Sequence, residues 1–166
     1  MSKKIKIGIT GLPGAGKTHA LNKVVEMLEA EGVKVGGMIT EAITEKRKKV
    51  GFMVKDLLTK DEGVLARVDM QSEVRFLEYG IDMDALDNIG VAAILRSVLH
   101  ADVIVIDEVG KLEVESKRFV EAVKEALEAD KPLLLTLHKK SRNPLLQDIR
   151  RRDDVRILEV TPINKN

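Results

Sequence analysis

The chain has 166 residues and no cysteine, and its 28 lysine and arginine residues almost balance 27 aspartate and glutamate residues. This length predicts one domain spanning residues 1–166, and no apolar run approaches the roughly 20 residues that a membrane helix needs. The net charge of +1 argues against a dedicated binder of nucleic acid or of an anionic membrane, and the lack of cysteine excludes disulfides and thiolate catalysis. The N-terminal residues run directly into a strand pattern without an apolar signal segment, so we expect a cytoplasmic protein. These properties do not predict an oligomeric state.

The first predicted elements are a strand, a loop and a helix. Residues 5–9 alternate between apolar and polar side chains as a strand does, and residues 11–18 form a glycine-rich loop. From Lys17 onward, apolar residues recur at helical spacing as far as Leu28. Gly32 follows, and a glycine can adopt the left-handed conformation that ends a helix.

A hairpin is predicted next. Residues 35–41 and 50–57 read as strands, and the charged stretch 45–49 between them is typical of a solvated tip. Residues 64–68 predict a third strand that extends this meander. Asp82 and Asp84 then provide N-caps for a helix that reaches about residue 98.

The second half alternates strands and helices. Residues 103–106 form a continuous apolar run, which is typical of a strand buried on both faces. Ser116 can cap a helix that ends before Pro132, and residues 133–137, 144–151 and about 155–160 predict a strand, a short helix and a last strand. The whole pattern predicts a three-layer α/β fold with a mostly parallel sheet and an inserted β-hairpin.

The glycine-rich loop matches the phosphate-loop pattern completely. Glycines let backbone N–H groups approach phosphate oxygens, the helix N-terminus favours negative charge, Lys17 reaches the β and γ phosphates, and Thr18 ligates Mg²⁺. The predicted nucleotide-binding residues of this motif are Gly11, Leu12, Pro13, Gly14, Ala15, Gly16, Lys17 and Thr18.

An acidic pair follows the buried run at residues 103–106. Asp107 lies where a carboxylate would orient Mg²⁺, and Glu108 can polarise a water for attack on the γ phosphate. Gly110 gives the next segment freedom for Lys111 to approach the charge that develops on the transferred phosphoryl group. The sequence thus predicts Glu108, Lys17 and Lys111 as catalytic residues and Thr18 and Asp107 as metal ligands.

Weaker candidates lie elsewhere. Thr136 and His138 come at the predicted carboxyl end of a central strand, where either could sense the γ phosphate, although a packing role suits them as well. The arginines at 142, 150–152 and 156 suit a charged helix face, with Arg142 as the candidate arginine finger. His19 and His100 suggest no metal site.

Together, residues 11–18, Gly51-Phe52, Tyr79-Gly80 and residues 103–113 resemble the cancer-related nucleoside-triphosphatase family, which is also found in thermophilic microbes. The similarity spans almost the whole chain. It implies a RecA-like phosphate-loop fold and slow, broadly specific hydrolysis of nucleoside 5′-triphosphates. It also implies a second nucleotide-contacting stretch made of Val103, Ile104, Val105, Ile106, Asp107, Glu108, Val109 and Gly110. Thr161-Pro162 and Asn164 resemble a late motif that the family usually follows with a further helix, whereas the present sequence stops at Asn166.

The sequence therefore predicts an Mg²⁺-dependent hydrolase that converts ATP, GTP, CTP or UTP to the diphosphate and phosphate. Two alternatives stay open. A small-molecule or nucleotide kinase uses the same loop, and a nucleotide-dependent switch would use slow hydrolysis to time its contact with a protein or an RNA.

Overall fold

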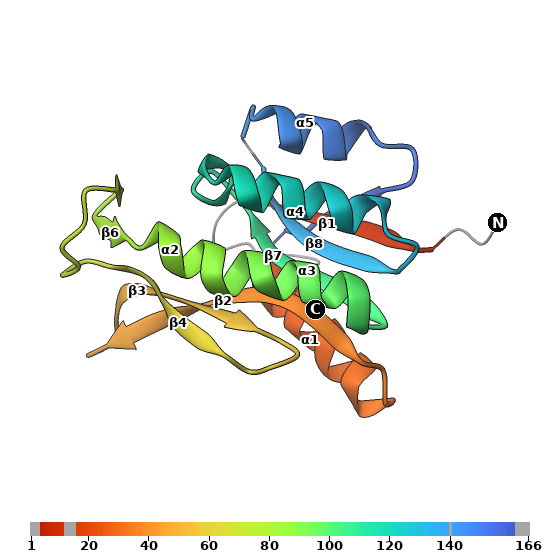
Figure 1. Ribbon diagram of the computed structural model, residues 1–166, viewed down its shortest axis with the longest axis horizontal. Helices are drawn as coiled ribbons and strands as arrows, with labels where there is room; N and C mark the ends of the chain where they lie inside the picture. Colours follow the sequence, from red (N-terminus) through yellow and green to blue (C-terminus); the bar gives the residue numbers. More distant parts are fainter. Residues whose placement is uncertain (1–3, 12–15, 140, 162–166) are drawn as a thin grey trace.

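The computed structural model describes residues 4–11, 16–139 and 141–161, and within these ranges the strands form a single nine-stranded sheet. The strand order is β5-β6-β4-β3-β2-β7-β8-β1-β9. Helices cover both faces, so the molecule has three layers (Figure 1). The sheet divides at β2 into a parallel half and an antiparallel half.

The parallel half carries the predicted phosphate chemistry. In sequence order its strands are β1 (Lys6–Gly11), β2 (Val35–Glu45), β7 (Val103–Val109), β8 (Leu133–His138) and β9 (Arg156–Glu159). Strand β8 lies between β7 and β1 and is parallel to both. The apolar runs of β7 and β8 are buried on both faces because helices pack on each side.

The antiparallel half is one meander attached to β2. Its strands are β3 (Lys48–Asp56), β4 (Glu62–Arg67), β5 (Arg75–Phe76) and β6 (Tyr79–Ile81). Strand β3 pairs with β2 as the predicted hairpin, β4 pairs with β3, and β6 joins β4. The inserted hairpin is therefore confirmed, and it is the first part of a larger antiparallel extension.

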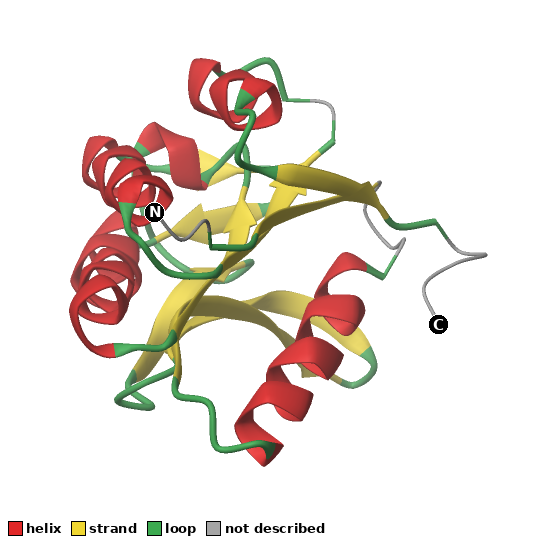
Figure 2. Ribbon diagram, turned by 90° about the vertical axis from the view of Figure 1, so that its right-hand side faces the viewer, coloured by secondary structure: helices red, strands yellow, loops and turns green. Residues whose placement is uncertain are grey.

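Helix α1 (Lys17–Ala30) covers one face of the sheet, and α3 (Ala92–His100), α4 (Lys117–Glu128) and α5 (Pro144–Arg151) pack on the other (Figure 2). Alternate residues of β7 serve the two cores. Val103 and Val105 pack with Leu21 of α1, whereas Ile104 and Ile106 join the larger core around Phe119 of α4.

Side-chain caps fix the helix starts. The Asp82 carboxylate accepts a hydrogen bond from the backbone N–H of Ala85 at the start of α2 (Met83–Ala85), and Ser116 Oγ accepts one from Phe119 at the start of α4. The expected helix after Asp82 forms in three parts, because a π-helical turn, η1 (Leu86–Val91), joins α2 to α3. Gly32 has a φ of +82° just after α1, as its predicted role requires.

The three-layer α/β fold is thus confirmed. Among the helices of the described residues, none combines the length and the apolar character needed to cross a bilayer.

Candidate active site

The predicted site residues gather where the parallel strands end. Gly11 at the end of β1 lies opposite His138 at the end of β8, and Val109 of β7 lies opposite Leu137. This edge therefore brings together the start of the glycine-rich loop and the acidic pair, as expected for ligand sites in open α/β sheets. Leu12, Pro13, Gly14 and Ala15 lie outside the described residues.

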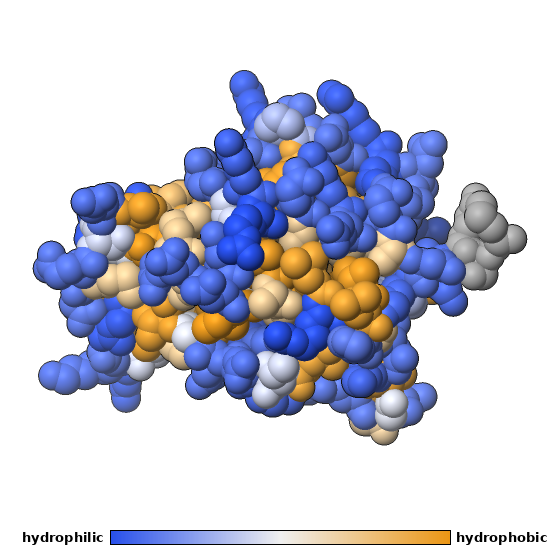
Figure 3. All heavy atoms as spheres, in the orientation of Figure 1, coloured by the Kyte–Doolittle hydropathy of each residue, from blue (hydrophilic) through white to orange (hydrophobic). Residues whose placement is uncertain are grey.

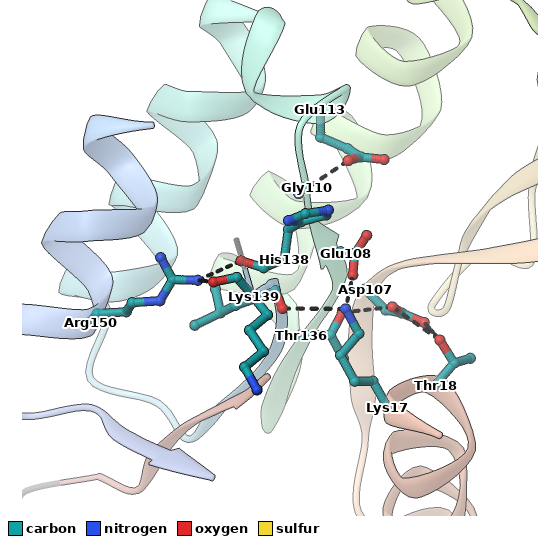
Figure 4. A network of polar contacts seen from close by, with 11 residues as sticks. Lys17, Thr18, Asp107, Glu108, Gly110, Glu113, Thr136, His138, Lys139 and Arg150 are labelled. Carbon is teal, nitrogen blue, oxygen red and sulfur yellow. Dashed lines mark hydrogen bonds and ion pairs between the residues drawn. The ribbon is translucent and has the colours of Figure 1, made fainter. Parts of the chain in front are cut away.

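Lys17 begins helix α1 and points into the acidic pair. The preceding residue, Gly16, has a φ of +99°, which turns the chain from the loop into the helix. The Lys17 amino group is buried and lies 2.6 Å from Glu108 Oε2 and 3.3 Å from the carbonyl oxygen of Leu137 (Figure 4). A lysine held this way is positioned before any phosphate arrives.

Asp107 is buried beside Thr18. Thr18 Oγ1 lies 3.2 Å from Asp107 Oδ2, and Thr136 Oγ1 donates a hydrogen bond of 2.7 Å to Asp107 Oδ1. Burial raises the pKa of Asp107 to about 6, the hydrogen bond from Thr136 opposes this rise, and repulsion from Glu108 adds to it. Thr136 therefore fixes the rotamer of the carboxylate.

These oxygens fit a magnesium ion. Magnesium prefers hard oxygen ligands and keeps several waters, and it commonly takes one or two protein oxygens with the phosphates of a substrate. Thr18 Oγ1 and the Asp107 carboxylate provide such a pair on adjacent elements, and the carboxylate is held by Thr136 from its far side.

A tight turn follows Glu108. The backbone N–H of Gly110 donates a hydrogen bond of 3.1 Å to Glu113 Oε1, and Glu113 begins the 3₁₀ turn η2 (Glu113–Glu115). A Cβ at Gly110 would lie 2.7 Å from Glu113 Oε1 and 2.9 Å from Glu108 Oε1, so a side chain there would displace the carboxylate ends of these two glutamates. Burial raises the pKa of Glu113 to about 8, and repulsion from Glu108 and Asp107 adds to the rise. Glu113 thus carries its proton at neutral pH.

Two neighbouring cavities open at this edge among the described residues. The phosphate-side cavity, of about 390 Å³, is bounded by residues 16–19, Asp107 and Glu108. The ring-lined cavity, of about 440 Å³, lies against the antiparallel strands and is bounded by Phe52, Phe76, Tyr79 and the segment from Lys111 to Glu113. The two cavities share the wall residues Thr40, Lys49, Phe52, Glu108 and His138.

The remaining predicted residues lie at different places relative to the two cavities. Lys111 is exposed and lies in the wall of the ring-lined cavity, which Glu108 also lines. Residues 103–106 are buried in the two cores, so the acidic pair at 107–108 supplies the part of this stretch that faces the phosphate-side cavity. His19 is exposed in the wall of the same cavity. Pro162 and Asn164 lie outside the described residues.

Arg150 contacts the backbone that follows β8, next to the site. From α5 its guanidinium donates hydrogen bonds to the carbonyl oxygens of His138, Lys139 and Ser141 (Figure 4). These contacts hold the backbone that leaves β8. Arg142, the candidate arginine finger, is exposed and lines neither cavity.

Sequence reasoning assigned no chemical role to Thr40 or Glu113, placed Lys49 in a solvated hairpin tip and placed Arg150 on a charged helix face. Thr40 interrupts the apolar start of its strand, which is a usable signal for a site residue. Glu113 contacts Gly110 only three residues earlier, whereas the contacts of Arg150 depend on the packing of α5 beside the end of β8.

A parallel sheet whose glycine-rich loop meets an acidic strand end defines the class of phosphate-loop nucleotide-binding proteins. A family model described as NTPase matches residues 6–166, and the chain belongs to this family. The resemblance that the motifs indicate is thereby confirmed.

Individual relatives support the same family assignment. The chain is 45% identical over 159 residues to the nucleoside-triphosphatase THEP1 of Thermofilum pendens, covering 95% of this chain and 87% of that protein. It is 41% identical to the THEP1 of Picrophilus torridus, covering 98% and 90%.

Two solved structures share the fold. The crystal structure of THEP1 from Aquifex aeolicus superposes with a TM-score of 0.83 at 30% identity, covering 96% of this chain and 92% of that one. The solution structure of a human cancer-related nucleoside triphosphatase gives a TM-score of 0.81 at 31% identity, covering 97% and 91%.

Proposed function

We propose that the chain hydrolyses nucleoside 5′-triphosphates slowly and with broad base specificity, and that the reaction requires Mg²⁺ and yields the diphosphate and phosphate. The observation that carries the proposal is the convergence of Lys17, Thr18, Asp107 and Glu108 at the end of the glycine-rich loop. Names of relatives as nucleoside-triphosphatases support it.

The phosphate-binding residues act first. Backbone N–H groups of the glycine-rich motif and the Lys17 amino group bind the phosphates, and Thr18 and Asp107 hold the metal. A magnesium ion held by Thr18 and Asp107 would supply positive charge beside the phosphates. Thr136 keeps the Asp107 carboxylate in place through its hydrogen bond of 2.7 Å.

Glu108 then acts as the general base. Its carboxylate pairs with Lys17 at 2.6 Å. A phosphate that binds Lys17 competes for this contact, so Glu108 is released to accept a proton from the attacking water. Lys111, across the wall from Lys17, approaches the γ phosphate and stabilises the charge of the transition state.

The test is phosphate release from ATP, GTP, CTP and UTP, with and without Mg²⁺, by the wild type and Glu108→Gln. We expect release from all four nucleotides, its loss without metal, and a fall in kcat of about 100-fold or more in the variant with little change in nucleotide affinity. Glu115→Gln is the matched control, because Glu115 is exposed and lines neither cavity.

Retention of most activity by Glu108→Gln would assign the base to another group. Nucleotide binding without phosphate release would instead favour the kinase or the switch, since a hydrolase needs only water.

A further inference from the structure

The ring-lined cavity gathers most of the aromatic side chains of the protein. The chain has three phenylalanines, one tyrosine and no tryptophan, and Phe52, Phe76 and Tyr79 line this cavity. The rings of Phe52 and Tyr79 meet edge to face with centroids 5.4 Å apart. A chain with so few aromatic residues thus places them in one hollow, where a flat ring could pack against them.

Most of the ring-lined cavity lies away from the residues that are proposed to bind the phosphates. Its walls come mostly from β3, β4, β5, β6 and the turn after Glu108, whereas residues 16–19 line only the phosphate-side cavity. Glu108 lies in the wall between the two. Hydrolysis needs only a water molecule beside Glu108, so an apolar hollow of about 440 Å³, within the range of small-molecule sites, is not explained by that reaction.

The charges around the cavity favour an uncharged ligand. Lys49 lies over the Phe52 ring, 5.2 Å from its centroid, and Glu108 is paired with Lys17. Glu113 is buried and protonated at neutral pH, as its raised pKa indicates, so it adds no charge. Lys111 and Glu78 are exposed at the rim and carry opposite charges. The walls therefore provide aromatic rings and hydrogen-bonding groups, and their charges favour neither a cationic nor an anionic ligand.

We propose that the ring-lined cavity binds a second small molecule, an uncharged heteroaromatic compound of about nucleoside size, against Glu108. The bound ring packs on Phe76 and Tyr79 and lies against Glu108, which lines the same cavity. Water then reaches Glu108 less readily, so the ligand slows phosphate release. This second effect rests on the proposed function, whereas the binding itself does not.

Binding is tested with 2-aminopurine riboside, an uncharged heteroaromatic probe whose fluorescence is quenched when its base stacks. The protein has no tryptophan, so its own emission at the excitation wavelength of the probe is negligible. The titration is made at pH 7 with the β,γ-imido analogue of ATP and Mg²⁺ at saturation, so that the site of the triphosphate is already filled. We expect saturable quenching at one site per chain.

Two exposed leucines give a matched pair of variants. Leu77 lines the cavity and is 78% exposed, whereas Leu99 on α3 is 74% exposed and lies outside it. Figure 3 shows apolar atoms at the surface around α3, and the control variant likewise replaces an exposed leucine with an aspartate. A charge at the cavity rim opposes entry of an apolar ring, so we expect Leu77→Asp to weaken probe binding about tenfold and Leu99→Asp to leave it unchanged.

Phe76→Ala should weaken binding as well, because it removes a ring without adding charge. Equal binding to Leu77→Asp, Phe76→Ala and Leu99→Asp would overturn the site, as would an absence of saturable quenching. A second titration omits the ATP analogue at first. Loss of the bound probe when the analogue is then added, but not when inorganic tripolyphosphate is added, would also overturn the site, because the probe would then occupy the base site of the nucleotide.

Phosphate release from ATP provides the second readout. Saturating probe should slow release by the wild type several-fold without raising the KM for ATP, and Leu77→Asp should require more probe for the same effect. Probe binding without slower release would refute the effect on water while leaving the site in place. Failure of the proposed hydrolysis itself would appear as an absence of phosphate release without probe.

Discussion

The buried carboxyl group of Glu113 makes the stability of the protein depend on pH in a predictable direction. The unfolded chain ionises this group near its ordinary pKa of 4.5, whereas the folded protein holds the proton until about pH 8. Between these values the folded state binds more protons, so the free energy of unfolding falls as pH rises. The replacement Glu113→Gln removes this dependence, because an amide cannot ionise and its oxygen can still accept the hydrogen bond from Gly110.

The magnitude follows from the two pKa values. Each unit of difference corresponds to about 1.4 kcal/mol, so the shift from 4.5 to about 8 sets a ceiling of about 5 kcal/mol on the stability lost across this range. The free energy of unfolding of Glu113→Gln, relative to that of the wild type, should therefore rise by up to about 1.4 kcal/mol for each pH unit from 5 to 8. Asp107 and His138, whose pKa values are also shifted, titrate in both proteins, so their contributions cancel in the difference.

Urea unfolding followed by circular dichroism at pH 5, 6, 7 and 8 measures this difference. Glu115→Gln serves as the control, because that side chain is exposed and its substitution should leave the pH dependence of the wild type intact. Parallel stability curves for the wild type and Glu113→Gln would refute the reasoning, since they would show that Glu113 ionises alike in the folded and unfolded chains.

Two further substitutions test the packing of the site. Thr136→Val removes the hydrogen bond to buried Asp107 without changing the shape of the side chain, so urea unfolding should show a loss of about 1–3 kcal/mol, and Thr136→Ser should retain most of the stability. Gly37→Ala should lower the free energy of unfolding by about 3 kcal/mol or more, because its Cβ would lie 1.9 Å from the carbonyl oxygen of Val105. Gly32→Ala has a positive φ but open space, so its cost should stay near 1 kcal/mol, and equal losses at both glycines would contradict the steric argument.

Much of the parallel half could be predicted from local sequence. The apolar run at residues 103–106 predicts a central strand because helices must cover both of its faces, and Ser116 marks the start of the next helix through its hydroxyl group. Lys17, Thr18, Asp107 and Glu108 were predictable as a group, since the carboxyl ends of parallel strands meet at one edge.

The antiparallel half shows where local patterns fall short. Strands β5 and β6 have two and three residues, too few for a period to be recognised, and their place depends on the pairing of β6 with β4 and of β5 with β6. The helix after Asp82 shows the expected apolar spacing, but the π-helical turn within it adds no signal that periodicity can detect. The ring-lined cavity also escapes prediction, because its aromatic residues come from β3 and from the short strands at the edge.

The division of the sheet at β2 has an evolutionary consequence. Strands β3, β4, β5 and β6 all come from one continuous stretch, residues 48–81, whereas the loop, the acidic pair and Thr136 come from segments before and after it. One exchange of contiguous coding sequence can therefore replace the wall that carries Phe52, Phe76 and Tyr79 and leave the phosphate chemistry in place. The three aromatic residues of the cavity and the residues predicted to bind the phosphates therefore occupy separate stretches of this chain, so the two sets can diverge at different rates among its relatives.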